Sequence, residues 1–208
     1  MDLALEKKVF YHNIRIVSFN TMVLALVYIG AIYLMINKSS LLEDTLAFIG
    51  DQLFSPLGII MFVRTALYEL EYKTSEMVYS KIYPYWRSIL YRIIIISIQL
   101  FLVLSIAFVP LKFFRVDFNL VNILFGSFVT SFFLGIIGMI LGYITNEVSV
   151  GVLIPFLYYF FEMFSKGKYT KGYYLFGMIV GNYASKIRLF SIAIFLVILL
   201  MIVIKKQV

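Results

Sequence analysis

The sequence predicts an all-α polytopic membrane protein, and three observations support this prediction. Of the 208 residues, 62% are hydrophobic and only 14% are charged, whereas a soluble globular domain carries roughly 25% charged residues. Six apolar segments follow one another along the chain, most of them close to the ~20 residues that cross a bilayer core. Polar residues gather between these segments. A soluble protein this apolar would expose large hydrophobic patches, so we expect a single transmembrane domain over residues 1–208.

The chain before the first apolar segment is amphipathic. Residues 1–16 mix charged side chains with apolar ones such as Leu3 and Phe10, and they carry too much charge to cross a bilayer. We expect an interfacial helix on the inner leaflet, where its basic residues suit contact with anionic lipid. His12 is the only histidine and the chain has no cysteine, which excludes a multi-histidine metal site and disulfides within one chain.

Six transmembrane helices are expected from the apolar segments. We place the spans at residues 17–36, 47–68, 89–111, 120–144, 148–163 and 189–204. The second span contains two charged residues, Asp51 and Arg64, with Pro56 between them. A charge inside a span is costly and suggests a function. Arg64, however, lies about one turn from the predicted inner surface, where it can snorkel to water or pair with Glu69 or Glu71.

The fourth predicted span carries small residues at four-residue spacing. This spacing places them on one helix face and lets neighbouring backbones approach closely. We expect them to pack inside the bundle, with dimerisation through this face as the alternative. These helix-packing residues are Ser127, Ser131, Gly135, Gly138 and Gly142.

The C-terminal third contains a short span and a polar stretch. The fifth span follows a tight polar turn, contains Pro155, and is bracketed by Glu147 and Glu162, both of which we expect at membrane interfaces. Residues 164–186 are rich in lysine and tyrosine and hold too short an apolar run to cross the bilayer. We predict that they form a re-entrant element between spans five and six, on the outer side.

Lysine and arginine residues in short loops give the expected orientation. With the N-terminus in the cytoplasm, that side holds Lys7, Lys8, Arg15, Lys73, Lys81, Arg87, Arg92, Lys205 and Lys206. The short outer loops then hold only Lys38, Lys112 and Arg115. The polar stretch at residues 164–186 adds lysines outside, Lys186 among them, which weakens the bias without reversing it. Both termini and the connection between spans two and three are therefore expected in the cytoplasm.

The connection between spans two and three has a helical pattern of its own. Thr74 stands at an N-cap position, Glu76 falls in the first turn, and Pro84 ends the segment. We predict a short amphipathic helix that lies against the inner membrane surface. Its apolar face consists of Met77, Val78 and Ile82.

This connection also resembles a known family. The sequence E-L-E-Y-K-T-S-E-M-V-Y-S, from Glu69 to Ser80, is similar to the E-x-E-x-x-T-x-E-x-x-x-S stretch of ABC-2 type transporter permeases. In that family the stretch follows the second transmembrane helix and forms the coupling helix, which docks on a separate ATP-binding subunit. A polar turn before a short fifth helix and a re-entrant element before the last span add to the resemblance.

The resemblance implies the permease subunit of an ATP-driven exporter in a bacterial plasma membrane, working as a homodimer with two ATPase subunits. ATP and magnesium would bind to those partners, so this chain would hold no cofactor and would not be an enzyme. By analogy the cargo is a peptide or another amphipathic or hydrophobic compound, moved for export or self-immunity; drug or lipid efflux is the alternative. The implied ATPase contacts are Glu69, Glu71, Thr74, Glu76, Met77, Val78 and Ile82, with Asn146 and Glu147 as a second cytoplasmic contact.

Other classes stay open as alternatives: an intramembrane enzyme, and a secondary carrier or a non-transport scaffold protein. The chain has no P-loop, since its only Gly-Lys pair, Gly167-Lys168, is followed by Tyr169 and lacks the earlier glycine. ATP hydrolysis would therefore need a second polypeptide. Few polar groups lie inside the predicted spans, which counts against an intramembrane enzyme. The two halves show no internal repeat of the kind that secondary carriers use.

Overall fold

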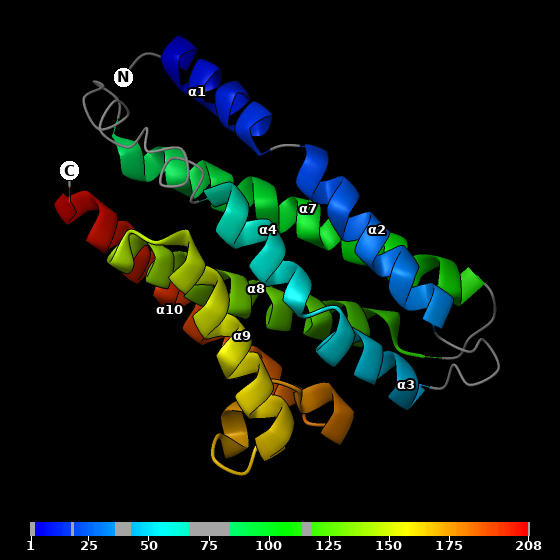
Figure 1. Ribbon diagram of the computed structural model, residues 1–208. Coiled ribbons are helices and arrows are strands. Elements are labelled where there is room, and N and C mark those ends of the chain that lie inside the picture. Colours follow the sequence, from blue (N-terminus) through cyan, green and yellow to red (C-terminus); the bar gives the residue numbers. More distant parts are fainter. Residues whose placement is uncertain (1–2, 18, 36–42, 67–83, 114–117, 208) are drawn as a thin grey trace.

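The computed structural model describes residues 3–17, 19–35, 43–66, 84–113 and 118–207, and within these ranges the chain is helical and contains no strand (Figure 1). The elements are α1 (Leu3–Ile16), α2 (Phe19–Met35), α3 (Glu43–Phe48), the π-helical turn η2 (Ile49–Leu53), α4 (Pro56–Ala66), α7 (Tyr85–Phe113), α8 (Leu120–Thr145), α9 (Val148–Ser165), the 3₁₀ turns η3 (Lys171–Tyr173) and η4 (Gly177–Val180), and α10 (Tyr183–Gln207).

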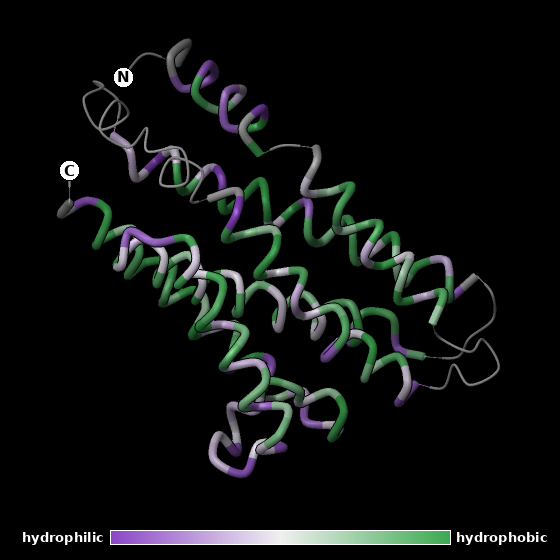
Figure 2. Tube along the Cα trace, in the orientation of Figure 1, coloured by the Kyte–Doolittle hydropathy of each residue, from purple (hydrophilic) through white to green (hydrophobic). Residues whose placement is uncertain are grey.

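The predicted class, a helical membrane protein, is confirmed. Five described segments are long and apolar enough to cross a membrane: Glu43–Arg64, Tyr85–Lys112, Leu120–Thr145, Val148–Ser165 and Tyr183–Lys205. The first predicted span corresponds to α2, which is apolar but has only 17 residues. Six crossings therefore remain a prediction. Figure 2 shows the hydrophobic residues along the middles of these helices and many of the hydrophilic ones near their ends.

Three segments begin earlier than the predicted spans. The second span starts at Glu43 and not near residue 47. The last helix starts at Tyr183 and not near residue 189, because Lys186 lies on its buried face and is paired there, so this polar residue does not have to reach water. The third span starts at Tyr85, directly after Pro84. Proline at this position needs no N–H partner and favours a helix start in the residues that follow it.

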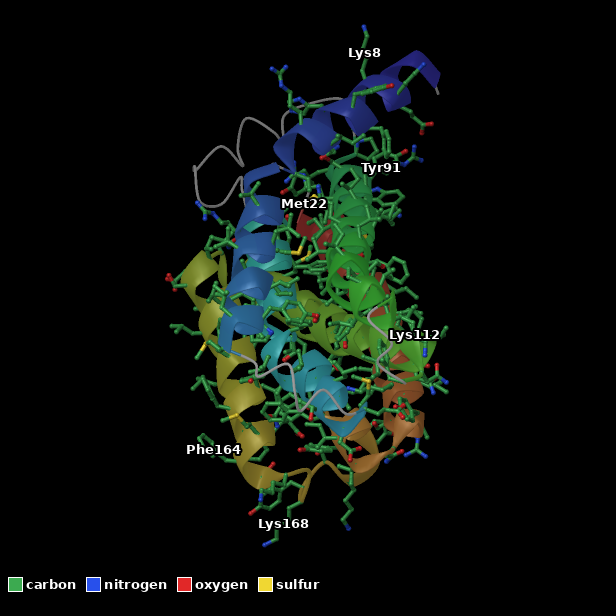
Figure 3. The ribbon with its side chains drawn as sticks, turned by 90° about the vertical axis from the view of Figure 1, so that its right-hand side faces the viewer. Lys8, Met22, Tyr91, Lys112, Phe164 and Lys168 are labelled. Atoms are coloured by element: carbon green, nitrogen blue, oxygen red, sulfur yellow. The ribbon has the colours of Figure 1, made fainter. Side chains whose placement is uncertain are left out.

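The helices alternate in direction, which sorts the connections between the two ends of the bundle (Figure 1). One end, here called the terminal end, holds both chain termini, the start of α7 and the turn between α8 and α9. The other, the hairpin end, holds the start of α3, the start of α8 and the stretch of residues 166–182 between α9 and α10, here called the hairpin. Lys8 and Lys168 mark these opposite ends in Figure 3.

The small residues of α8 lie where other helices come close to it. A Cβ atom at Gly58 of α4 would overlap the backbone of Ser131, and one at Gly135 would meet the Phe62 ring and the Gly58 carbonyl. Gly138 faces Val63 of α4 and the Gly151 carbonyl of α9. The remaining two predicted packing residues are buried as well: Ser127, against Gly50, and Gly142. The backbones of α4 and α8 are therefore separated by almost no side-chain volume.

The N-terminal helix is attached to the start of α7 by polar contacts. Asn13 of α1 is fully buried, and its Oδ1 accepts hydrogen bonds from Ser88 Oγ over 2.9 Å and from Arg92 Nε over 2.8 Å. Glu6 and Arg87 form an ion pair at 3.3 Å on the same two helices. These contacts fix the rotation of α1. Its placement on the inner leaflet stays a prediction.

The close approach of α4 and α8 predicts opposite effects for two glycine substitutions. Gly58→Ala should destabilise the protein by about 1–3 kcal/mol, because the new methyl group has to displace the Ser131 backbone. Gly30→Ala is the matched control, since nothing lies within 4 Å of a Cβ at this α2 position, and it should leave stability unchanged or raise it slightly. Thermal unfolding of the purified variants in detergent measures both. Equal melting temperatures would contradict the close packing.

Candidate functional site: a buried polar layer beneath the hairpin

The predicted coupling helix lies outside the described residues. This applies to Glu69, Glu71, Thr74, Glu76, Met77, Val78 and Ile82. The helices on either side of this connection are described: α4 ends at Ala66 and α7 begins at Tyr85, and the start of α7 lies at the terminal end (Figure 1).

The second predicted contact, Asn146 and Glu147, forms an exposed turn at the terminal end. Asn146 caps α8 in the left-handed conformation with φ 55°, and Glu147 is extended with φ −127°. The Glu147 N–H donates a hydrogen bond to Thr145 Oγ1 over 3.3 Å. Both side chains are exposed, so this turn is free for contact with another protein.

The second span is interrupted between Leu53 and Pro56. Phe54 N donates to the Ile49 carbonyl over 2.9 Å, the bond of a π turn. Pro56 has no N–H and leaves the Gln52 carbonyl without its helical partner. Ser55 Oγ and Tyr159 OH donate to this carbonyl instead, over 3.0 and 3.2 Å.

The next two carbonyl groups are also satisfied from other helices. Tyr28 OH of α2 donates to the Leu53 carbonyl over 2.8 Å, and Ser131 Oγ of α8 donates to the Phe54 carbonyl over 3.1 Å. A break in a span is tolerated only where neighbouring groups restore its hydrogen bonds. The break therefore fixes the second span against α2, α8 and α9.

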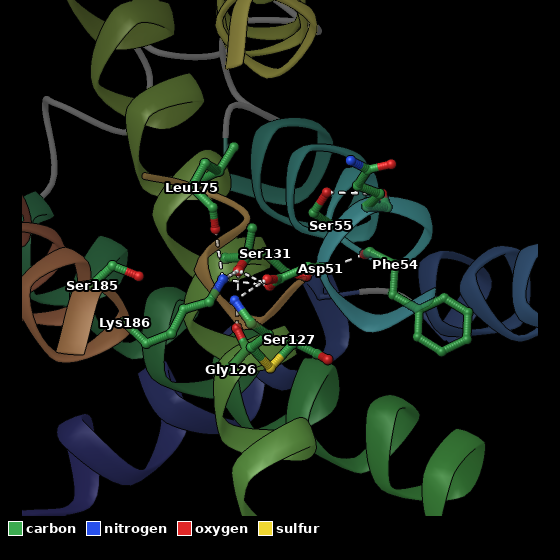
Figure 4. Close-up of polar contacts among 12 residues, drawn as sticks. Asp51, Phe54, Ser55, Gly126, Ser127, Ser131, Leu175, Ser185 and Lys186 are labelled. Atoms are coloured by element: carbon green, nitrogen blue, oxygen red, sulfur yellow. Dashed lines mark hydrogen bonds and ion pairs between the residues drawn. The ribbon is translucent and has the colours of Figure 1, made fainter. Parts of the chain in front are cut away.

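Asp51 lies in this π turn and is completely buried. Its Oδ1 forms an ion pair with Lys186 of α10 and a 2.9 Å hydrogen bond with Thr130 Oγ1 of α8 (Figure 4). Its Oδ2 accepts a hydrogen bond from Met178 N of the hairpin over 2.8 Å. Contacts from three separate segments therefore converge on one carboxylate.

Lys186 is also completely buried, and its ammonium group has three acceptors. These are Asp51 Oδ1, Thr130 Oγ1 at 2.5 Å and the Leu175 carbonyl at 2.6 Å. An ammonium group has three donors, so each is used. Both charges of the pair are therefore compensated within the protein, as the burial of an ion pair requires.

The hairpin is held down by backbone contacts and by one inserted side chain. Leu175 and Phe176 are fully buried. The Met178 side chain fills the space beside two glycines, because a Cβ atom at Gly126 would overlap its sulfur and one at Gly50 would meet its terminal methyl group. The buried middle of the hairpin thus packs between η2, α8 and α10.

Glu162 of α9 belongs to the same layer beneath the hairpin and is completely buried by the protein. Its expected position at a membrane interface stays a prediction. Its Oε2 accepts hydrogen bonds from Thr170 Oγ1 over 3.1 Å and from Leu175 N over 3.5 Å. Burial raises the pKa of Tyr174 beside it, and the Glu162 and Asp51 carboxylates raise this pKa further. The Tyr174 hydroxyl therefore stays protonated at neutral pH.

The sequence pointed to Asp51 but not to its partner. Lys186 was assigned to the outer stretch at residues 164–186, yet it shares a helical stripe with buried residues of α10: Leu189, Ala193, Leu200 and Ile204. Continuing that stripe one turn toward the N-terminus would have placed Lys186 in the core.

The Asp51–Lys186 pair suits an anchor better than a reactive group, because both side chains are completely buried and every Lys186 donor is used. Within the described ranges, no group of three or more His, Cys, Asp or Glu side chains could hold a metal ion. No family model, no curated protein and no solved structure matches the chain.

The anchor predicts a non-additive pair of substitutions. Asp51→Asn or Lys186→Met alone should cost about 3–5 kcal/mol of stability, because each leaves the other charge buried and unpaired. The double variant should recover most of that loss. Thermal unfolding in detergent measures all three, with Asp44→Asn, an exposed acid on α3, as the control. Additive losses in the double variant would contradict pairing.

Proposed function

We propose that the chain is the membrane permease subunit of an ATP-driven exporter of the ABC-2 type, working as a homodimer with two separate ATPase subunits in a bacterial plasma membrane. The main support is the stretch from Glu69 to Ser80, which is similar to the coupling helix of that family. In this proposal the ATPase subunits bind ATP and magnesium, and this chain carries the cargo pathway.

The described helix ends support a mechanical role for this stretch. It joins α4 to α7, and the start of α7 is attached to α1 through Asn13, Ser88 and Arg92. The α8–α9 turn lies at the same end of the bundle (Figure 1). In this proposal an ATPase subunit that binds this end would contact the 67–83 connection together with Asn146 and Glu147, and its movement would reach α1, α4 and α7 directly.

The hairpin lies on the outer side in this proposal, in the position of the family's re-entrant element. The hairpin closes the outer end of the bundle over Asp51 and Glu162, and its anchor on Lys186 would keep it in place while the inner end moves. The proposed cargo is a peptide or another amphipathic compound, by analogy with small members of the family.

The coupling role predicts loss of a partner ATPase. Glu76→Lys with Met77→Asp places unpaired charges on the proposed docking face, where loss of one partner of a buried contact typically costs 2–5 kcal/mol. The tagged double variant, purified from membranes of its native host, should then carry at least about tenfold less co-purifying Mg-ATPase activity than the native chain. Insertion should be unaffected, because the changes lie outside the spans.

The control for this experiment is Asp44→Lys, a comparable charge reversal at the exposed start of α3 on the hairpin end. It should retain the ATPase activity of the native chain. Either of two results would contradict the coupling role of residues 69–80. The first is a native chain that co-purifies with no ATPase activity, and the second is a double variant that retains the full ATPase activity of the native chain.

The proposed orientation predicts that two exposed lysine positions lie on opposite sides of the membrane, so that only one of them is labelled from outside the cell. The native chain has no cysteine, so single cysteines report without background. Lys168→Cys on the hairpin should react with an impermeant maleimide in whole cells, and Lys8→Cys on α1 should react only after the membrane is opened. The reverse pattern would place the ATPase-facing end outside the cell and overturn the proposed function.

A further inference from the structure

Two buried oxygen atoms near the end of α9 have no hydrogen-bond partner. They are Glu162 Oε1 and Ser165 Oγ, and a separation of three residues puts them on the same side of the helix. Buried polar atoms in folded proteins are nearly always paired with protein groups, water or an ion. The two atoms therefore leave acceptor positions that no described group of the chain fills.

The contacts that Glu162 does have come from neutral groups. Thr170 Oγ1 and Leu175 N donate to Oε2 over 3.1 and 3.5 Å, and the Tyr158 hydroxyl also faces this carboxyl group. Among the described residues, the ion pairs are Glu6 with Arg87 and Asp51 with Lys186. The negative charge of Glu162 thus has no cationic partner in the part of the chain that the structure shows.

The position of Glu162 on its helix adds to this deficit. It lies in the last turn of α9, where the free carbonyl groups give the helix end a partial negative charge. That turn contains no basic residue, and the Lys166 side chain that follows is exposed. A carboxylate at this end of a helix is disfavoured, whereas a cation beside it is favoured.

Asp51, the other buried carboxylate beneath the hairpin, has its negative charge neutralised by a cation. Its charge is balanced by Lys186, whose donors are all used on Asp51, Thr130 and Leu175. Leu175 joins the two carboxylates, since its carbonyl accepts from Lys186 and its N–H faces Glu162. The layer beneath the hairpin, as described, holds two carboxylates and one ammonium group, and is short of one positive charge.

We propose that Glu162 and Ser165 form a cation site beneath the hairpin, which takes up one positive charge as an alkali-metal ion or as a proton. Alkali-metal ions are hard cations that prefer oxygen ligands, and the site offers carboxylate and hydroxyl oxygens only. Since Thr170 and Leu175 belong to the hairpin and contact Glu162, the bound charge ties the hairpin to α9. The site depends on these local contacts and not on the exporter function.

Other ionisable groups lie on the elements around the site and are kept constant in its test. They are Tyr158 and Lys166 at α9, Lys168, Lys171 and Tyr174 on the hairpin, Asp51 on η2, and Lys186 and Arg188 on α10.

Thermal unfolding of the purified full chain tests the proposal. Melting temperatures are compared in sodium, potassium and N-methylglucamine chloride at equal ionic strength, and then from about pH 5 to pH 8. A metal site raises the melting temperature in sodium or potassium relative to N-methylglucamine by roughly 2–4 °C. A proton site shows no such preference, and its melting temperature falls as pH rises, because the folded state loses the proton that it holds more tightly than the unfolded state.

Two matched variants separate the site from the rest of the protein. Glu162→Gln keeps the shape, removes the charge and offers an N–H group to Ser165 Oγ, so it should lose the response and be at least as stable as the native chain at high pH without metal. Glu147→Gln changes an exposed acid at the other end of α9 and should keep the native response. A native chain that responds to neither metal nor pH, or a Glu162→Gln variant that keeps the response, overturns the cation site.

Discussion

A chain that crosses a bilayer has to satisfy its backbone hydrogen bonds from within, and the break between Leu53 and Pro56 is where this requirement shapes the whole bundle. The Gln52 carbonyl loses its helical partner to Pro56, and hydroxyl groups from other helices donate to this carbonyl and the next two: Tyr159, Tyr28 and Ser131. Each replacement ties another helix to the second span. The same turn directs Asp51 inward, and this charge in turn positions Lys186 and the hairpin.

Electrostatics explains why the hairpin end is built so differently from the terminal end. At the terminal end Glu6 and Arg87 form a partly exposed ion pair, and one charge is buried, since Arg92 lies in the protein interior and its Nε donates to Asn13 Oδ1. At the hairpin end Asp51, Glu162 and Lys186 are all buried. Buried charges are stable only with close partners, so this end is held by specific contacts that tolerate little displacement. Among the described residues, the terminal end holds fewer buried charges than the hairpin end.

The sequence predicts the helices well and the site poorly, for a physical reason. Spans follow from the length and polarity of single segments, which is why the membrane class and the polar turn at Asn146 are readable. Asp51 stood out because a charge in a span is rare. Lys186 and Glu162 did not, because a charged residue near the end of a span normally reaches water. Only the folded hairpin, which covers both, removes that water, and its path depends on contacts between residues far apart in the chain.

Helix α8 connects the two ends. Its small residues bring α4 to near-contact through Gly58 and Gly135, while Thr130 on the same helix touches both Asp51 and Lys186. Interfaces without intervening side chains slide poorly, since any shift makes backbone atoms collide. The backbone contact at Gly58 and the Thr130 contacts with Asp51 and Lys186 therefore lie on one helix, which links the second span to the buried layer beneath the hairpin.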